Sequence, residues 1–170
     1  MMECDVYFTK DNVVVCCHDT RLGRIAGTEK TIADYNYADL PPIRKVLDYG
    51  GYAGSYVQTD EDDGQWLTLE TLFASMPDKI LYSIDLKGIK SYYGATLVYN
   101  LIKRFGLERR VVWGSGDSET HAKLSELNPD IAKYYPYNSL VNLHLWHMFG
   151  CLFCRKLEND FLMSPIMTSE

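Results

Sequence analysis

Apolar and polar side chains alternate along the first part of the chain in the manner of β-strands. Residues 3–8 alternate with a period of two, a polar turn occupies residues 9–12, and residues 13–17 form an apolar run. A period of two predicts a half-buried strand, and the polar residues between the two runs predict a turn. We therefore expect a strand, a turn and a second strand.

The segment that follows gives weaker signals. Residues 20–65 are rich in Gly, Asp and Tyr and include Pro41-Pro42, a composition that indicates mostly loop. Its helix candidate is short and lies around Ile43 to Leu47.

From Thr68 onward, helical and extended patterns alternate along the chain. Apolar positions spaced by three and four predict helices, and short apolar runs between turn residues predict strands. Because the connections are short, this order favours an α/β fold with a parallel sheet and right-handed crossovers. The expected helices are 68–76, 92–105 and 118–127, and the expected strands are 80–86, 110–113 and 131–135.

Composition and charge narrow the class of protein. The 170 residues, 46% of them hydrophobic, suffice for one hydrophobic core, so we expect a single domain over residues 1–170. A net charge of -6 argues against a nucleic-acid partner. The odd number of cysteines and the absence of a leader pattern predict reduced thiols and a cytoplasmic or internal-membrane location.

Polar side chains gather near the ends of three expected strands. Glu3 and Asp5 share one face of the first strand, Asp85 and Lys87 share one face of another, and His18 ends the run between them. Three converging carboxylates need a compensating charge, and a hard divalent cation with oxygen ligands, Mg²⁺ or Ca²⁺, supplies it. Taken singly, the same residues are also compatible with solvated acids, a salt-bridged strand end and a turn.

Four stretches of the sequence together resemble the glycerophosphodiester phosphodiesterase family. They are ECDVYFTKDNVVVCCHDTRLGRIAGT, LTLETLFASMP, YSIDLKG and RRVVWGSGD. The resemblance implies a TIM barrel of the phospholipase-C-like phosphodiesterase type. The Asp at position 85 and the Val-Trp-Gly strand make the chain most similar to the animal membrane branch with lysophospholipase D activity.

The resemblance also implies a reaction and a role for each residue. Glu3, Asp5 and Asp85 match the ligands of one divalent cation, His18 matches a general acid and base, and Lys87 matches a lysine that contacts the phosphate. The expected activity is metal-dependent hydrolysis of glycerophosphodiesters or lysophospholipids to a (lyso)glycerol phosphate and an alcohol, a reaction of lipid metabolism. In the family, a glycerol hydroxyl attacks the phosphorus and water then opens the cyclic phosphate.

The sequence departs from the family pattern in one respect. Members begin their barrel with a strand ending in His-Arg-Gly, which supplies a partner histidine, and no such motif precedes Glu3. The expectation is an incomplete TIM barrel comprising strands two to six of eight. The alternative function is a catalytically impaired fragment or pseudoenzyme that binds metal or phosphate, or associates with a membrane or with a chain supplying the missing strands.

An apolar insertion is expected at about 139–157. Its longest apolar stretch falls short of the roughly 20 residues that span a bilayer, so we expect a buried helix or one in peripheral contact with a membrane. Just before it, residues 134–137 read Tyr-Tyr-Pro-Tyr, which indicates either an aromatic lip for a lipid or a core cluster.

Overall fold

A five-stranded sheet organises the chain. Its strands are β1 (Met2–Phe8), β2 (Val14–Cys16), β5 (Tyr82–Leu86), β6 (Val111–Gly114) and β7 (Ala132–Lys133), in the order β2-β1-β5-β6-β7. The structure is a computed structural model, and it describes residues 1–48, 56–58, 64–88, 92–134 and 137–150.

Four of these strands run parallel and one does not. β1, β5, β6 and β7 pair in parallel, whereas β2 pairs antiparallel with β1 through Val6 opposite Cys16. The strand predicted at residues 13–17 is therefore present, and it runs antiparallel to the strand before it. The physical reason is the turn at residues 9–12, which is too short for the crossover that parallel neighbours require.

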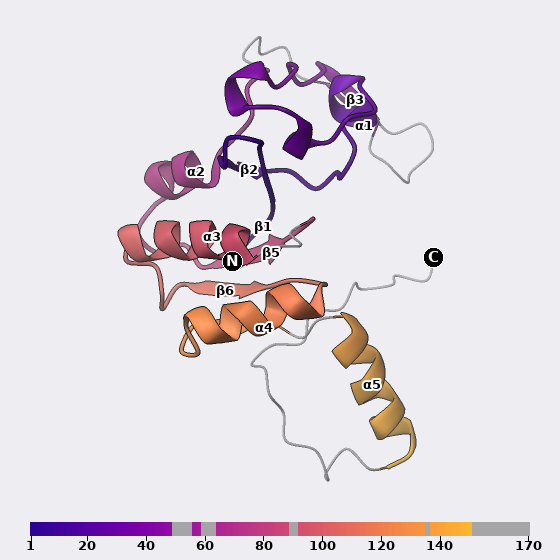
Figure 1. Cartoon of the computed structure of the whole chain (residues 1–170), viewed down its shortest axis with the longest axis vertical. Coiled ribbons are helices and arrows are strands. Elements are labelled where there is room, and N and C mark those ends of the chain that lie inside the picture. Colours follow the sequence, from indigo (N-terminus) through magenta and orange to yellow (C-terminus); the bar gives the residue numbers. More distant parts are fainter. Residues whose placement is uncertain (49–55, 59–63, 89–91, 135–136, 151–170) are drawn as a thin grey trace.

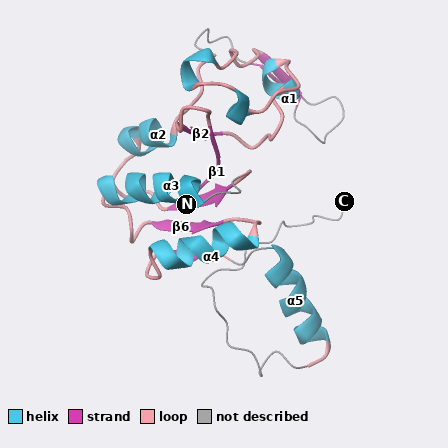
Figure 2. Cartoon of the chain, viewed as in Figure 1, coloured by secondary structure: helices cyan, strands magenta, loops and turns pink. Residues whose placement is uncertain are grey.

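Helices follow the parallel strands, as the sequence pattern predicts. They are α2 (Leu69–Ser75), α3 (Tyr92–Arg104) and α4 (Ser118–Leu127). α3 and α4 contact each other and lie beside the strands, whereas α5 (Tyr137–Met148) stands apart beyond the sheet (Figures 1 and 2). The N-caps of α2 and α4 are Thr68 and Asp117, whose side chains accept hydrogen bonds from backbone N–H groups in the first turn.

One face of the sheet is apolar and is covered by these helices. Because alternate strand residues point to opposite faces, the face opposite to this core carries Glu3, Asp5, Ser83 and Asp85. The sheet residues of the core are Cys4, Val6, Val14, Tyr82, Ile84, Leu86, Val111 and Trp113, and the helices add Leu69, Leu72, Phe73, Ala95, Val98, Ile102 and Leu124.

A second hydrophobic cluster holds together the described part of residues 20–65, which the sequence predicts to be mostly loop. Leu22, Ile25 and Ile32 pack there with Trp66, whose indole Nε1–H donates to the Pro41 carbonyl at 2.8 Å. Short elements surround the cluster: α1 (Gly23–Ala26) and the 3₁₀ turns Ile32–Asp34 and Tyr37–Asp39.

The expected helix around Ile43 to Leu47 is wrong. The structure instead places strand β3 (Val46–Asp48) against β4 (Tyr56–Gln58) in an antiparallel pair. An apolar run this short fits a helix or a strand equally well, and residues 46–48 are a strand because β4 supplies their hydrogen-bonding partner.

Candidate active site

Strands β1 and β5 bring the predicted acidic residues to one face of the sheet. In their parallel register Asp5 lies opposite Asp85, and Glu3 lies opposite Ser83. The pairing continues past the strand ends, because the Lys87 N–H donates to the Val6 carbonyl at 3.0 Å. Residues that are far apart in the sequence are thus fixed side by side by backbone hydrogen bonds alone.

Lys87 lies between the two aspartates. Its Nζ is 2.5 Å from Asp85 Oδ2 and 3.3 Å from Asp5 Oδ1. The aspartate side chains are only 13% and 10% exposed, whereas that of Lys87 is 35% exposed. Partial burial lowers the pKa of Lys87, but the hydrogen bond and charge of Asp85 raise it, and the net shift is upward. The ammonium group therefore stays charged while one side of it remains open to solvent.

Glu3 belongs to the same electrostatic cluster. Partial burial raises the pKa of Glu3, and the charges of Asp5 and Asp85 raise it further. Lys87 and His18 act in the opposite direction without cancelling the rise. The three carboxylates therefore carry more negative charge than the lysine beside them offsets.

His18 lies at the edge of this cluster. The Cys17 N–H donates to the Asp5 carbonyl at 2.9 Å, which ties the end of β2 to β1 just before the histidine. The imidazole itself is 79% exposed, and its Nδ1 lies 3.3 Å from Asp19 Oδ1. It is close enough to lower the pKa of Glu3, yet its described side-chain partner is Asp19.

Asp19 is held by an arginine. Arg24 donates from Nε and from one terminal nitrogen to the two carboxylate oxygens, each at 2.7 Å. The bidentate bond from Arg24 is the main reason that the pKa of Asp19 lies below its usual range. The carboxylate beside His18 is therefore both fixed in place and anionic.

The sequence pattern did not single out Tyr134 and Gly114 for this site. Tyr134 follows β7, is 5% exposed, and has its ring against the backbone of Gly114 at the end of β6. Burial and then the charge of Asp85 raise the pKa of Tyr134. An aromatic residue at a strand end was the available signal. Tyr135 and Pro136 lie outside the described residues, so for them the two interpretations, an aromatic lip for a lipid and a core cluster, both stay predictions.

The side chains differ from a preassembled metal site. In the described ranges, no three His, Cys, Asp or Glu groups come together closely enough to hold a metal ion. Two of the predicted ligands, Asp5 and Asp85, instead form ion pairs with Lys87. Asp85 Oδ1 is nevertheless buried without a hydrogen-bond partner among the described atoms, so an oxygen acceptor remains available there. Oxygen-only donors of this kind suit a hard cation.

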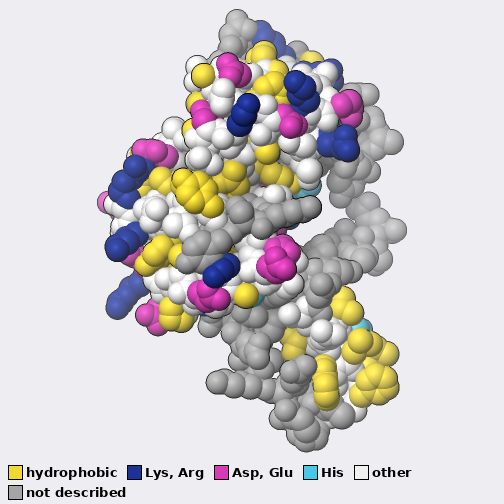
Figure 3. Space-filling view, in the orientation of Figure 1, with side chains coloured by type: hydrophobic (Ala, Val, Ile, Leu, Met, Phe, Trp, Pro, Cys, Tyr) yellow, Lys and Arg dark blue, Asp and Glu magenta, His cyan; other side chains and the backbone are white. Residues whose placement is uncertain are grey.

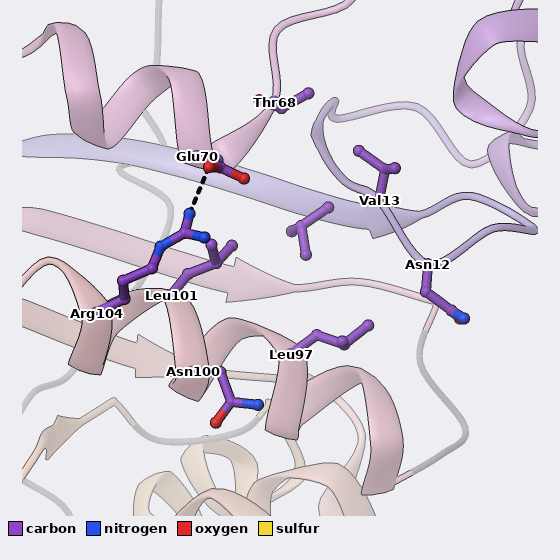
Figure 4. A pocket seen from close by; sticks show the side chains of 9 residues that line it. Asn12, Val13, Thr68, Glu70, Leu97, Asn100, Leu101 and Arg104 are labelled. Atoms are coloured by element: carbon purple, nitrogen blue, oxygen red, sulfur yellow. Dashed lines mark ion pairs between the residues drawn. The ribbon is translucent and has the colours of Figure 1, made fainter.

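A cavity of about 320 Å³ lies elsewhere, beside α2 and α3. Leu97, Leu101 and Val13 form much of its wall, and Glu70 and Arg104 face each other across one end with an ion pair of 2.6 Å (Figure 4). None of the predicted site residues lines it. It contributes nothing to the carboxylate cluster.

Comparison with known proteins identifies the family of this chain. Residues 1–146 match the Glycerophosphoryl diester phosphodiesterase family. The chain is 32% identical over 131 residues to human Lysophospholipase D GDPD1. The aligned region covers 77% of this chain and 40% of that protein. The chain is also 27% identical over 146 residues to human Lysophospholipase D GDPD3, covering 86% and 43%. The chain thus spans less than half the length of these relatives.

Solved structures agree on the fold. A putative glycerophosphodiester phosphodiesterase from Galdieria sulphuraria shares 26% identity at a TM-score of 0.58, covering 81% of this chain and 52% of that one. The glycerophosphoryl diester phosphodiesterase domain of a protein from Mycobacterium tuberculosis shares 14% identity at a TM-score of 0.64, covering 88% and 54%. The predicted α/β class and partial TIM barrel are confirmed.

Proposed function

This chain belongs to the Glycerophosphoryl diester phosphodiesterase family, and on that premise we propose that Glu3, Asp5, His18, Asp85 and Lys87 form a site for hydrolysis of a phosphodiester. The substrate class is a glycerophosphodiester or a lysophospholipid, as the names of the relatives suggest. The observation that carries the proposal is the contact of Lys87 with both Asp5 and Asp85, which face each other near the carboxyl end of the parallel pairing of β1 with β5. Active sites of barrels lie at that end of the strands.

In this proposal Glu3, Asp5 and Asp85 hold one divalent cation, Mg²⁺ or Ca²⁺. When bound, such a cation polarises a phosphoryl oxygen and stabilises the charge that develops on it. Partial burial is the main cause of the raised pKa of Glu3, and the charges of Asp5 and Asp85 raise it further. This second contribution supports the assignment, because a bound cation would offset those charges. The buried, unpartnered Asp85 Oδ1 supports it from geometry.

Lys87 and His18 have separate proposed roles. The Lys87 ammonium binds an anionic phosphoryl oxygen, since it is charged and retains a solvent-exposed side. His18 takes up the proton of the attacking hydroxyl as the oxygen of that hydroxyl bonds to phosphorus, a role open to histidine near neutral pH. The bond from phosphorus to the leaving alkoxide breaks, and solvent water protonates the alkoxide to the alcohol. Asp19 holds the imidazole on one side through the contact with Nδ1.

The test is release of choline from glycerophosphocholine and from lysophosphatidylcholine, with Mg²⁺ or Ca²⁺ supplied and with both chelated. We expect cation-dependent release that Asp85→Asn abolishes. Asp78→Asn is the matched control, because Asp78 is exposed on the turn before β5. Release that continues unchanged in Asp85→Asn, or that ignores chelation, contradicts the site.

A second candidate function is binding of a cation and phosphate without turnover. The observation that favours it is the placement of the other histidines: His121 lies on α4, and His144 and His147 are exposed on α5. His18 acts on the charge of Glu3, whereas α4 packs on the helix-covered face of the sheet and α5 lies beyond the sheet. Proton transfer on both sides of the phosphorus commonly uses two groups, and loss of one costs about 10²- to 10⁴-fold in rate. Calorimetric cation binding without measurable choline release distinguishes this function from the first.

The partner that suits α5 is a lipid surface. The helix contains no Lys, Arg, Asp or Glu, and Leu145, Trp146, Met148 and Phe149 in and after it are exposed, forming the apolar patch of Figure 3. No helix in the described part of the chain is both long enough and apolar enough to cross a bilayer. Contact along the interface, with the aromatic rings among the headgroups, therefore suits this helix better than insertion across the bilayer.

Trp146 provides a direct test of that contact. It is 38% exposed, whereas Trp66 and Trp113 are buried, so its fluorescence reports on the surroundings of α5. We expect a blue shift on adding phosphatidylcholine vesicles and loss of that shift in Trp146→Phe. Leu145→Ser should weaken vesicle binding, whereas Leu81→Ser, at an exposed leucine just before β5, should not. Equal weakening by both leucine variants contradicts a specific role for α5.

A further inference from the structure

The Tyr134 ring lies against the end of β6, beside the strand that carries Asp85. Gly114 is paired with Asp85 in the register of β5 and β6. A Cβ atom on Gly114 would lie 2.5 Å from Cζ of Tyr134, so the ring rests directly on the glycine backbone. The absence of a side chain at position 114 leaves the phenol next to Asp85 rather than displaced from it.

Tyr134 and Asp85 each carry one buried polar atom without a partner among the described atoms. The Tyr134 hydroxyl and Asp85 Oδ1 are both shielded from solvent, and neither has a hydrogen bond of full geometry among the described atoms. Burial is the main cause that raises the pKa of Tyr134, and its hydroxyl is close enough to Asp85 for that carboxylate, and more weakly Asp5 and Glu3, to raise the pKa further. A phenol has one proton to donate, and an ionised carboxylate only accepts. The two atoms are therefore complementary.

We propose that Tyr134 is a positioning residue whose hydroxyl donates a hydrogen bond to Asp85 Oδ1 and fixes the orientation of that carboxylate for cation binding. The inference rests on the proposed function, which makes Asp85 a ligand. Lys87 already holds Oδ2, so a donor on Oδ1 restrains the carboxylate from its other side. Each carboxylate oxygen has two lone pairs, so a bond from Tyr134 leaves Asp85 able to bind a cation.

Other buried aromatic residues near the sheet differ from Tyr134 in the surroundings of their polar atoms. Trp113 Nε1 is also buried without a described partner, but Trp113 belongs to the apolar core on the helix-covered face, tilted against Tyr99. Tyr82 belongs to the same core, where its ring meets Phe73 edge-on. Of these buried aromatic groups, it is Tyr134 whose polar atom meets the acidic face. Phe at position 134 would fill the same space without a proton to donate.

The experiment measures the affinity of the 170-residue chain for Ca²⁺ by titration calorimetry, without substrate. We expect Tyr134→Phe to weaken binding by about 10- to 100-fold, the range found when a residue that orients a metal ligand is lost. Tyr82→Phe is the matched control, because it removes a phenol hydroxyl from an equally buried tyrosine in the opposite core. Its affinity should equal that of the unsubstituted chain. Urea unfolding without Ca²⁺ should show that Tyr134→Phe remains folded.

The outcomes separate this inference from the proposed function. Unchanged or tighter Ca²⁺ binding by Tyr134→Phe, with binding lost in Asp85→Asn, overturns the role of Tyr134 and leaves the proposed site standing. Equal weakening by Tyr82→Phe also overturns it. No binding by the unsubstituted chain, or full binding by Asp85→Asn, overturns the proposed cation site and this inference with it.

Discussion

Asp5 and Asp85 lie opposite each other on the parallel strands β1 and β5, and their carboxylates share one ammonium group, that of Lys87. The pairing is a consequence of the backbone register, so the two acids cannot separate without disrupting the sheet. Their mutual repulsion must be offset locally, by the lysine or by a bound cation. This relationship makes the charge at position 87 a determinant of stability and, under the proposed function, of activity.

Replacing Lys87 by Met should destabilise the chain in the absence of divalent ions. Two partly buried carboxylates then lose their counter-charge, at a cost of about 1–3 kcal/mol in the free energy of unfolding. Ca²⁺ should restore more stability to this variant than to the unsubstituted chain, because it replaces the missing charge. Melting temperature with and without Ca²⁺ measures both effects, and Lys79→Met, at an exposed lysine, is the control. Phosphodiesterase activity should fall on the order of 10²- to 10³-fold.

Substituting Gly114 by Ala should also destabilise the fold. The added methyl would overlap the Tyr134 ring. Such overpacking typically lowers the free energy of unfolding by about 1–3 kcal/mol. Gly116→Ala is the control, since nothing lies within 4 Å of a Cβ there, and its effect should stay within about 0.5 kcal/mol. Urea unfolding compares the two variants. Equal stability of both would show that the ring moves aside freely.

Stability should depend on pH through Asp19. The bond from Arg24 depresses the folded-state pKa of Asp19 below the ordinary value of 3.8, so the unfolded chain takes up this proton first. The resulting stabilisation is complete above pH 3.8 and is lost as the pH falls through the folded-state pKa. Asp19→Asn should therefore lower stability by about 1 kcal/mol at pH 7, and by less at pH 3.

The measurement for Asp19 is the free energy of unfolding in urea between pH 3 and pH 7. Asp130→Asn, at an exposed position, is the control and should run parallel to the unsubstituted chain. A constant difference between Asp19→Asn and the unsubstituted chain at every pH would contradict the assignment.

Thr68 should contribute to stability as the N-cap of α2. Its hydroxyl oxygen accepts from the Thr71 N–H at 3.0 Å, satisfying a donor that the helix itself leaves open. Thr68→Ala should cost about 1 kcal/mol and Thr68→Ser much less, because serine keeps the acceptor. Chemical denaturation distinguishes them. If Ser and Ala cost the same, the methyl group rather than the hydroxyl is what matters.

Several parts of the fold followed from local pattern. The helices near 68–76, 92–105 and 118–127 and the apolar strand before Asp85 are all present, because period and capping residues act over a few positions. The direction of β2 and the strand at 46–48 did not follow, since each depends on a partner elsewhere in the chain. The structure describes the predicted apolar insertion at 139–157 only as far as residue 150. Most side chains between residues 141 and 150 are exposed.

By itself the sequence determined which face of β1 and β5 carries Glu3, Asp5 and Asp85, because strand alternation leaves no choice once the apolar face is buried. Only the tertiary structure decided how these charges are balanced. The parallel register sets Asp5 against Asp85, the reach of Lys87 joins them, and the bare backbone of Gly114 admits Tyr134 beside them. Those relations join strands separated by dozens of residues, and no local pattern encodes a distance between them.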